Sequence, residues 1–238
     1  MTVSKLLVAN RGEIAIRVMR AAAELDIATV AIFSEDDAQS LHVRRAGEAH
    51  PLRGSGAAAY LDIEQMVAAA QECDCDAIHP GYGFLAENAA FAAACADAGL
   101  VFVGPSVEAL QLFGDKVHAR ALALAEQQGI PVPPGSAHAV SLEEAQDFFA
   151  ALGDDGRMLI KAVGGGGGRG MRVVSAADEI VDAYARAASE ASSAFSNDAL
   201  YVERFIERAR HLEVQVIGDT TGAVSALGKR ECSAVTGS

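Results

Sequence analysis

Apolar residues along the first hundred positions follow two different periods. Short runs that are apolar throughout alternate with longer stretches in which apolar residues recur every three or four positions. The first pattern is typical of strands buried on both faces of a sheet, and the second predicts amphipathic helices. The alternation predicts βαβ units and an open, doubly wound parallel sheet over residues 1–103. The expected strands lie at 5–9, 27–34, 76–81 and 100–106, and the expected helices at 14–26, 60–75 and 87–99.

The pattern changes after this sheet. Residues 104–130 are expected to form a helical bridge, and the segment "IPVPPGS" that follows carries three of the six prolines, which marks a connection between units. Residues 131–203 are expected to form a small α+β unit. Its first helix should begin at Ser141, because Glu144 follows at the capping-box spacing.

The remaining pattern in the second half indicates hairpins. Apolar runs at 157–163 and 171–174 flank a glycine-rich turn, and a long helix is expected at 175–195. Further strands are expected at 199–206, 210–219 and 220–233. Residues from 204 to 238 are read as the start of another domain.

The turn between the two strands, in "LIKAVGGGGGRGMRVV", contains five consecutive glycines. Inside regular structure, each glycine lowers the stability of the fold by roughly 0.5–1 kcal/mol relative to alanine, because its backbone loses more entropy on folding. Five glycines in a row therefore indicate a function that needs them. A flexible linker is one possibility. The short length, the flanking strands and Lys161 favour a loop whose backbone N–H groups close over phosphate oxygens. The spacing is not that of a Walker loop, so a mobile flap over a nucleotide is the better interpretation.

Composition narrows the class of protein. The 238 residues carry a formal net charge of -13, which argues against a nucleic-acid binder. No apolar run approaches ~20 residues, so no membrane span is expected, and the first strand leaves no room for a signal peptide. The four cysteines are irregularly spaced and are read as reduced thiols. A cytoplasmic location is therefore expected.

Several motifs, in this order, closely resemble the biotin carboxylases, which are the ATP-grasp subunits or domains of acetyl-CoA, propionyl-CoA and related biotin-dependent carboxylases. The motifs are "VANRGEIAIRVMRAA", "HPGYGFLAEN", "FVGPS", "GDKVHAR", "KAVGGGGGRGMRVV", "YVERFI" and "RHLEVQVIGD". The resemblance runs from about residue 3 to residue 233. It implies an N-terminal pre-ATP-grasp domain at 1–103, an ATP-grasp lid at 131–203 and the first strands of a C-terminal ATP-grasp domain from 204.

The resemblance also implies an activity and a set of partners. Such enzymes use MgATP and bicarbonate to make carboxyphosphate, whose CO2 is passed to N1 of biotin on a carrier protein. The expected partners are the biotin carboxyl carrier protein, a carboxyltransferase and a second copy of the parent enzyme. Acetyl-CoA carboxylase and fatty acid biosynthesis are the settings that the resemblance first suggests.

Roles for individual residues are likewise implied by the resemblance. Lys116 and Lys161 would bind ATP phosphates, and Glu203 would accept a hydrogen bond from the adenine amino group. Taken alone, Lys116, Glu203, Arg204 and His211 would each be an ordinary solvent-facing side chain. The remaining residues implied at the site are Gly164, Gly165, Gly166, Gly167 and Gly168 over the phosphates, Met171 near adenine, the backbone of Arg204 and Ile206 in the same pocket, His211 toward the ribose or phosphates, and His79, Tyr82, Gly83 and Glu87 on the biotin side of the cleft.

The sequence departs from the family's pattern at its end. After "ECS" the family has a basic segment and, later, the magnesium-binding glutamates, the bicarbonate base and the biotin arginine, whereas here "AVTGS" follows. No complete catalytic set or metal site is therefore expected in this chain, which we expect to be an incomplete, inactive or weakly nucleotide-binding part of the enzyme. The alternatives are a non-catalytic nucleotide-binding or dimerising module and another ATP-grasp carboxylase or ligase.

Overall fold

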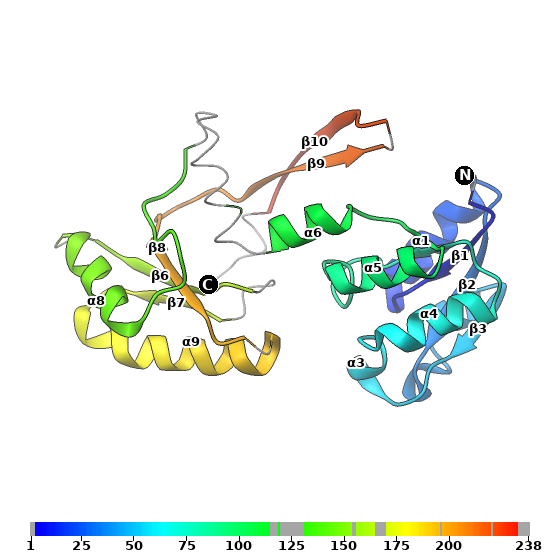
Figure 1. Ribbon diagram of the computed structural model, residues 1–238, viewed down its shortest axis with the longest axis horizontal. Helices are drawn as coiled ribbons and strands as arrows, with labels where there is room; N and C mark the ends of the chain where they lie inside the picture. Colours follow the sequence, from blue (N-terminus) through cyan, green and yellow to red (C-terminus); the bar gives the residue numbers. More distant parts are fainter. Residues whose placement is uncertain are drawn as a thin grey trace. The chain divides into compact units, whose positions relative to one another are not determined.

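The structure is a computed structural model that separates into two compact units, Met1–Gln111 and Leu112–Ser238 (Figure 1). It describes residues 3–114, 119, 131–153, 156–164, 170–195, 197–219 and 221–232. Each unit has its own sheets and its own core, and each is described separately below.

The first unit is built on a five-stranded sheet in which every paired strand is parallel to its neighbour. The strand order is β3-β2-β1-β4-β5. Starting from β1, the chain adds β2 and β3 on one side of the sheet and then returns to add β4 and β5 on the other side. This confirms the predicted doubly wound α/β fold. The strands are β1 (Lys5–Val8), β2 (Ala28–Phe33), β3 (Glu48–Pro51), β4 (Ala77–His79) and β5 (Val101–Phe102).

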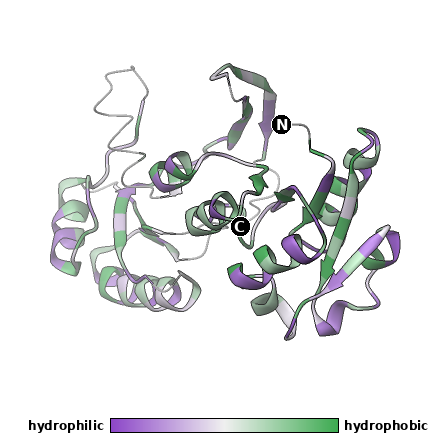
Figure 2. Ribbon diagram, turned by 45° about the vertical axis from the view of Figure 1, so that its right-hand side comes forward, coloured by the Kyte–Doolittle hydropathy of each residue, from purple (hydrophilic) through white to green (hydrophobic). Residues whose placement is uncertain are grey.

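Different helices bury the two faces of this sheet. Leu6 and Val8 of β1 pack in a core with helix α1, whereas Leu7 packs with α3, α4 and α5 on the opposite face. Because neighbouring residues of a strand point to opposite faces, a strand buried on both sides must be apolar at every position. The inner strands of this sheet are accordingly largely green in Figure 2, whereas the edge strand β3 is mostly purple. The helices of this unit are α1 (Gly12–Ala23), α2 (Leu41–Arg45), α3 (Gly56–Ala59), α4 (Ile63–Glu72), α5 (Ala89–Asp97) and the start of α6 (Val107–Gly114).

One strand was not predicted. β3, with the sequence "EAHP", pairs in parallel with β2 at the edge of the sheet. Its residues are exposed or only half-buried, so it carries no apolar run. An edge strand also tolerates the proline at its end, because one side of it makes no ladder hydrogen bonds.

The second unit contains a three-stranded antiparallel sheet in the order β7-β6-β8. Its strands are β6 (Met158–Ala162), β7 (Met171–Val174) and β8 (Leu200–Arg204), and its helices are α8 (Leu142–Ala151) and α9 (Ile180–Phe195). Residues Met158, Ile160 and Ala162 of the central strand share one core with α8 and α9. The hairpin predicted on either side of the glycine run is confirmed as the β6–β7 pair.

Helix α8 begins as the sequence predicts. The backbone N–H of Glu144 donates to Ser141 Oγ across 3.2 Å, and the backbone N–H of Ser141 donates to Glu144 Oε2 across 2.7 Å. These reciprocal bonds satisfy two N–H groups that a helix start leaves without partners, so the predicted capping box is confirmed.

A separate antiparallel hairpin, β9 (Leu212–Gly218) and β10 (Val224–Glu231), follows the three-stranded sheet. Residues 115–118 and 120–130 of the expected helical bridge lie outside the described residues, and α6 covers part of the remainder. The division between the two compact units falls inside this expected bridge. The finer boundary at residue 203, between a lid and a further domain, stays a prediction.

Candidate functional site

The three-stranded sheet carries three of the predicted nucleotide-site residues on its second face, the one opposite α8 and α9. Residues paired across neighbouring strands point to the same face, and Lys161 pairs with Met171 on β7 and with Tyr201 on β8. Leu159, two residues earlier on β6, pairs with Glu203 and so lies on this face as well. The register therefore brings Met171, Lys161 and Glu203 together from three strands.

Lys161 and Glu203 are bonded to each other. The Lys161 ammonium donates to the Glu203 carboxylate in a charge-assisted contact. The side chains are 21% and 15% exposed, so the pair is more shielded than a surface ion pair but still open to a ligand. Two predicted site residues that lie 42 positions apart in the sequence thus form one ion pair.

The strand end beyond Glu203 borders a small cavity of about 290 Å³. The backbone N–H of Arg204 donates to the Pro134 carbonyl across 2.7 Å, and that of Phe205 donates to the Arg157 carbonyl across 2.8 Å. These bonds fix the segment whose backbone was expected to line an adenine pocket. The cavity is lined by Arg157, Arg204, Phe205, Ile206 and Glu207.

The other residues expected at the nucleotide either lie outside the Lys161–Glu203 pair or are not among the described residues. His211 immediately precedes β9, and its carbonyl accepts a hydrogen bond from the backbone N–H of Cys232 across 2.8 Å. It therefore belongs to the β9–β10 hairpin and not to the sheet that holds Lys161. Gly164 is described next to β6, whereas Lys116 and residues 165–168 lie outside the described residues.

In the first unit, the loops that follow β1 and β4 meet at the point where the winding of the sheet reverses direction. Such a switch point is where ligands bind in open α/β sheets. Asn10, which is 2% exposed, joins the loops because its Nδ2 donates to the Pro80 carbonyl across 2.7 Å and to the Tyr82 carbonyl across 2.8 Å. The loops line a cavity of about 370 Å³ formed by residues 10–14 and 82–84.

The four residues expected on the biotin side lie on or after β4, but they do not all face this cavity. Tyr82 and Gly83 line it, and the Tyr82 hydroxyl donates to the Glu13 carboxylate, which raises the pKa of the tyrosine. His79 lines a different, mostly apolar cavity of about 460 Å³. Glu87 is exposed in the turn before α5.

His79 is held as a neutral ring. Burial lowers the pKa of its imidazole, because a charged ring is disfavoured away from water. The backbone N–H of Gly81 donates to His79 Nδ1 across 2.9 Å, which leaves the ring proton on Nε2.

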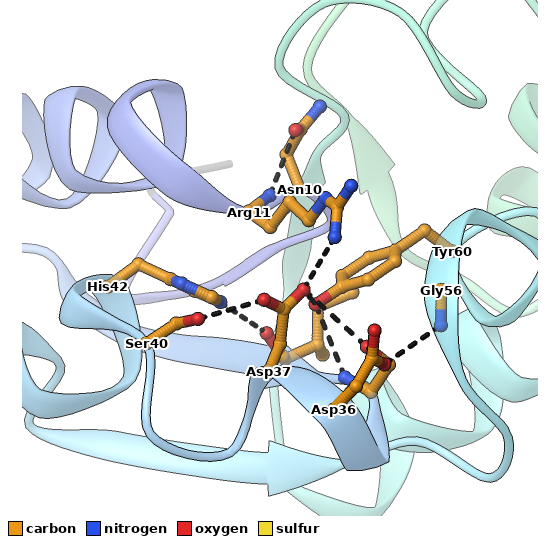
Figure 3. A network of polar contacts seen from close by, with 10 residues as sticks. Asn10, Arg11, Asp36, Asp37, Ser40, His42, Gly56 and Tyr60 are labelled. Atoms are coloured by element: carbon orange, nitrogen blue, oxygen red, sulfur yellow. Dashed lines mark hydrogen bonds and ion pairs between the residues drawn. The ribbon is translucent and has the colours of Figure 1, made fainter.

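A polar network that the sequence analysis did not find supports these loops (Figure 3). Arg11 Nη1 donates to Asp37 Oδ2 across 2.9 Å, and the Tyr60 hydroxyl donates to the same oxygen across 2.8 Å. Burial alone would raise the pKa of Asp37, but hydrogen bonds from Arg11, Ser40 and Tyr60 outweigh it and lower the pKa to about 2.

Aromatic rings complete the network. The Arg11 guanidinium lies 5.4 Å from the centroid of the Tyr60 ring and 5.9 Å from that of the Phe84 ring. The two rings stack with centroids 5.2 Å apart. Phe84 follows Tyr82 and Gly83 directly, so the network links the loop after β1 to the loop after β4. The "NRGE" turn was visible in the sequence, but nothing in it indicated these partners.

Neither a metal centre nor a membrane helix is found in the described parts of the chain. No three His, Cys, Asp or Glu side chains there gather closely enough to hold a metal ion. Within the same residues, no helix combines the length and apolar character needed to cross a bilayer. Cys73, Cys75, Cys95 and Cys232 are free thiols.

Comparisons with known protein families agree with the two-unit structure. The family "Biotin carboxylase, N-terminal domain" matches residues 2–110, and the family "Carbamoyl-phosphate synthase L chain, ATP binding domain" matches residues 115–236. Pyruvate carboxylase of Bacillus subtilis is 52% identical over 236 residues, which is 98% of this chain and 20% of that protein. Biotin carboxylase of a Nostoc species is 46% identical over 235 residues, covering 98% of this chain and 52% of that protein.

A solved structure gives the same result. The biotin carboxylase domain dimer of Hydrogenobacter thermophilus 2-oxoglutarate carboxylase, in complex with MgADP, ADP and bicarbonate, matches with a TM-score of 0.89 and 43% identity. The match covers 98% of this chain and 51% of that one, so the chain spans about half of a biotin carboxylase. With both of its units matched in order, the chain belongs to the biotin carboxylase family, as an N-terminal domain followed by an ATP-binding domain of the carbamoyl-phosphate synthase L chain type.

Proposed function

We propose that the chain is the nucleotide-binding half of a biotin carboxylase. The reaction transfers the γ-phosphoryl group of ATP to bicarbonate, giving ADP and carboxyphosphate, which breaks down to CO2 and phosphate. N1 of biotin then forms a bond to the carbon of CO2 and loses its proton. The observation that carries the proposal is the gathering of Lys161, Glu203 and Met171 on one face of the three-stranded sheet.

The chemistry of that face suits the two ends of a nucleotide. The Lys161 ammonium would turn toward the phosphates, where a compact positive charge is most effective. The Glu203 carboxylate would accept a hydrogen bond from the adenine amino group, while Met171 packs on the ring. The backbone of Arg204 and Ile206 would line the adenine pocket, which is supported by the cavity beside these residues.

The remaining contacts to the nucleotide extend the same proposal. Lys116 would add a second ammonium at the phosphates, and the backbone N–H groups of residues 164–168 would close over them. His211 would face the ribose or phosphates. Mg²⁺ would arrive with ATP and neutralise phosphate charge, but the described residues offer no group of ligands for it, and we assign no step to it.

Biotin is proposed to approach from the first unit, beside His79, Tyr82, Gly83 and Glu87. The proposal is supported by the cavity at the reversal point of the sheet, which Tyr82 and Gly83 line. The proposed domains are 1–103, a bridge at 104–130, a lid at 131–203 and the start of a C-terminal domain at 204–238.

The proposed partners follow from the activity. A biotin carboxyl carrier protein would present biotin, and a carboxyltransferase would select the acceptor, whether acetyl-CoA in fatty acid biosynthesis or pyruvate. Homodimerisation of the parent enzyme is supported by the dimer of the related Hydrogenobacter domain. A cytoplasmic location is supported by the free thiols.

Nucleotide binding by the 238-residue chain tests the proposal. Isothermal titration should show ATP binding that weakens at least several-fold in Lys161→Ala, because a phosphate loses its ammonium partner. Lys229→Ala is the matched control, since Lys229 is an exposed lysine on β10 and should bind ATP like wild type. Equal affinities for all three proteins would contradict the phosphate role. ATP-dependent carboxylation of free biotin should not be detected with this chain, which spans about half of the related biotin carboxylases, and measurable turnover would contradict this expectation.

A further inference from the structure

Tyr201 lies directly across the β6–β8 pair from Lys161, in the cross-strand row that Met171 completes. Its side chain is 4% exposed and packs with Val163 and Ala199. The centroid of its ring is 5.9 Å from the Lys161 ammonium nitrogen. The ring is therefore a buried surface next to the Lys161 ammonium, the group that would contact a phosphate in the proposed complex.

The two contacts of the Lys161 ammonium differ in what a nucleotide would do to them. Its bond to Glu203 is diagonal, because Glu203 pairs with Leu159 and not with Lys161 itself. In the proposed complex, Glu203 also serves the adenine amino group, and the ammonium must direct at least one of its three N–H donors toward a phosphate. The Tyr201 ring, in contrast, is used by neither the adenine nor the phosphates in the proposed complex, so its contact with the ammonium competes with neither.

We propose that Tyr201 is a positioning residue of the nucleotide site, holding the Lys161 ammonium on the phosphate-facing side through the face of its ring. This inference rests on the proposed function. The ring acts in two ways. Its volume fills the space over β8 that the Lys161 side chain would otherwise occupy. Its negative face attracts the ammonium, as aromatic faces attract cations within about 6 Å.

A double-mutant cycle on the whole chain tests the role. Tyr201→Leu should weaken ATP binding about two- to five-fold, the size expected of a cation–π contact near a partly exposed cation. Tyr201→Phe, which keeps the ring, should stay within about two-fold of wild type. In a Lys161→Met background, Tyr201→Leu should have no further effect, because the group that the ring positions is gone. Adenosine, which lacks phosphates, should bind wild type and Tyr201→Leu equally.

Three results would contradict the positioning role of Tyr201. Unchanged ATP affinity in Tyr201→Leu, an equal loss in the Lys161→Met background, or an equal loss for adenosine would each show that Tyr201 acts only as a core residue. Failure of the wild-type chain to bind ATP would refute the proposed nucleotide site and this role with it.

A second measurement needs no nucleotide. It therefore distinguishes a wrong positioning role for Tyr201 from a wrong proposal about the nucleotide site. The chain has four lysines, Lys5, Lys116, Lys161 and Lys229, so the NMR spectrum of reductively ¹³C-methylated protein should be simple to assign. The Lys161 methyl signal should shift in Tyr201→Leu and stay close to wild type in Tyr201→Phe, because ring currents act only on nearby groups. A Lys161 signal that ignores the loss of the ring would overturn the positioning role, whatever the ATP titrations show. Thermal melting checks that each variant remains folded.

Discussion

Arg11 and Asp37 form an ion pair across 2.9 Å that joins the loop after β1 to the loop after β2. The carboxylate is only 17% exposed, and the Tyr60 hydroxyl donates to the same oxygen that Arg11 contacts. Because Arg11 also lies over Phe84, this pair connects three loops at the carboxyl edge of the parallel sheet. Four predictions concern this edge of the sheet and the hairpin of the second unit.

Asp37→Asn should lower the free energy of unfolding of the first unit by about 1–2 kcal/mol. The substitution keeps the shape of the side chain but removes charge-assisted hydrogen bonds at a largely buried position. Urea unfolding followed by circular dichroism measures the change. Glu24→Gln is the matched control, because the Arg20–Glu24 pair is highly exposed and should contribute at most a few tenths of a kcal/mol. Equal effects of the two substitutions would contradict the role of Asp37.

The stability of the first unit should depend on pH through Asp37. Its pKa is about 2 in the folded protein, below the ordinary value of 3.8, so its stabilising contribution is complete above pH 4 and is lost as the pH falls toward 2. The difference in free energy of unfolding between wild type and Asp37→Asn should therefore shrink between pH 4 and pH 2. A difference that stays constant across this range would show that the carboxylate is not the stabilising group.

Gly81→Ala should destabilise the first unit more than Gly99→Ala does. Both glycines have a positive φ, +68° and +73°, so both substitutions carry a backbone penalty of about 1 kcal/mol. Only at Gly81 would the new Cβ meet a neighbour, at 2.7 Å from Asn10 Nδ2, and displace the amide that ties the loops together. Thermal melting compares the two variants, and equal losses would mean that the approach of Asn10 is not required.

The β9–β10 hairpin should promote self-association of this chain. Its register places Val214, Val216 and Val224 on one face, and all three side chains are more than half exposed. An apolar strip on a two-stranded sheet favours contact with another surface. Val216→Lys should reduce association in sedimentation velocity experiments at several concentrations. Ser225→Lys, on the opposite face, is the control, and an equal reduction by both would assign the effect to net charge.

The sequence predicted the α/β core well because parallel strands must be apolar throughout, and runs such as "KLLVA" satisfy that requirement. β3 was missed because an exposed edge strand carries no such run. In the second unit, alternation within "MLIKA" and "LYVER" contains the information that puts Lys161 and Glu203 on one face, but only the register aligns them.

The network around Arg11 could not be predicted from the sequence. Arg11 and Asp37 are 26 positions apart, and Tyr60 is a further 23 positions along the chain. No local pattern marks partners at such separations, since their meeting depends on the strand order and on the conformations of three loops. The biotin-side residues illustrate the same limit, because His79 and Tyr82 are close in sequence yet line different cavities.

The central claim is that the face of the three-stranded sheet opposite α8 and α9 holds a nucleotide. A crystal structure of the chain soaked with ADP tests it most directly. The adenine amino group should lie within hydrogen-bond distance of Glu203, and the Lys161 ammonium should contact a phosphate oxygen. Nucleotide bound elsewhere, with Lys161 still bonded to Glu203 as it is in the present structure, would contradict the claim.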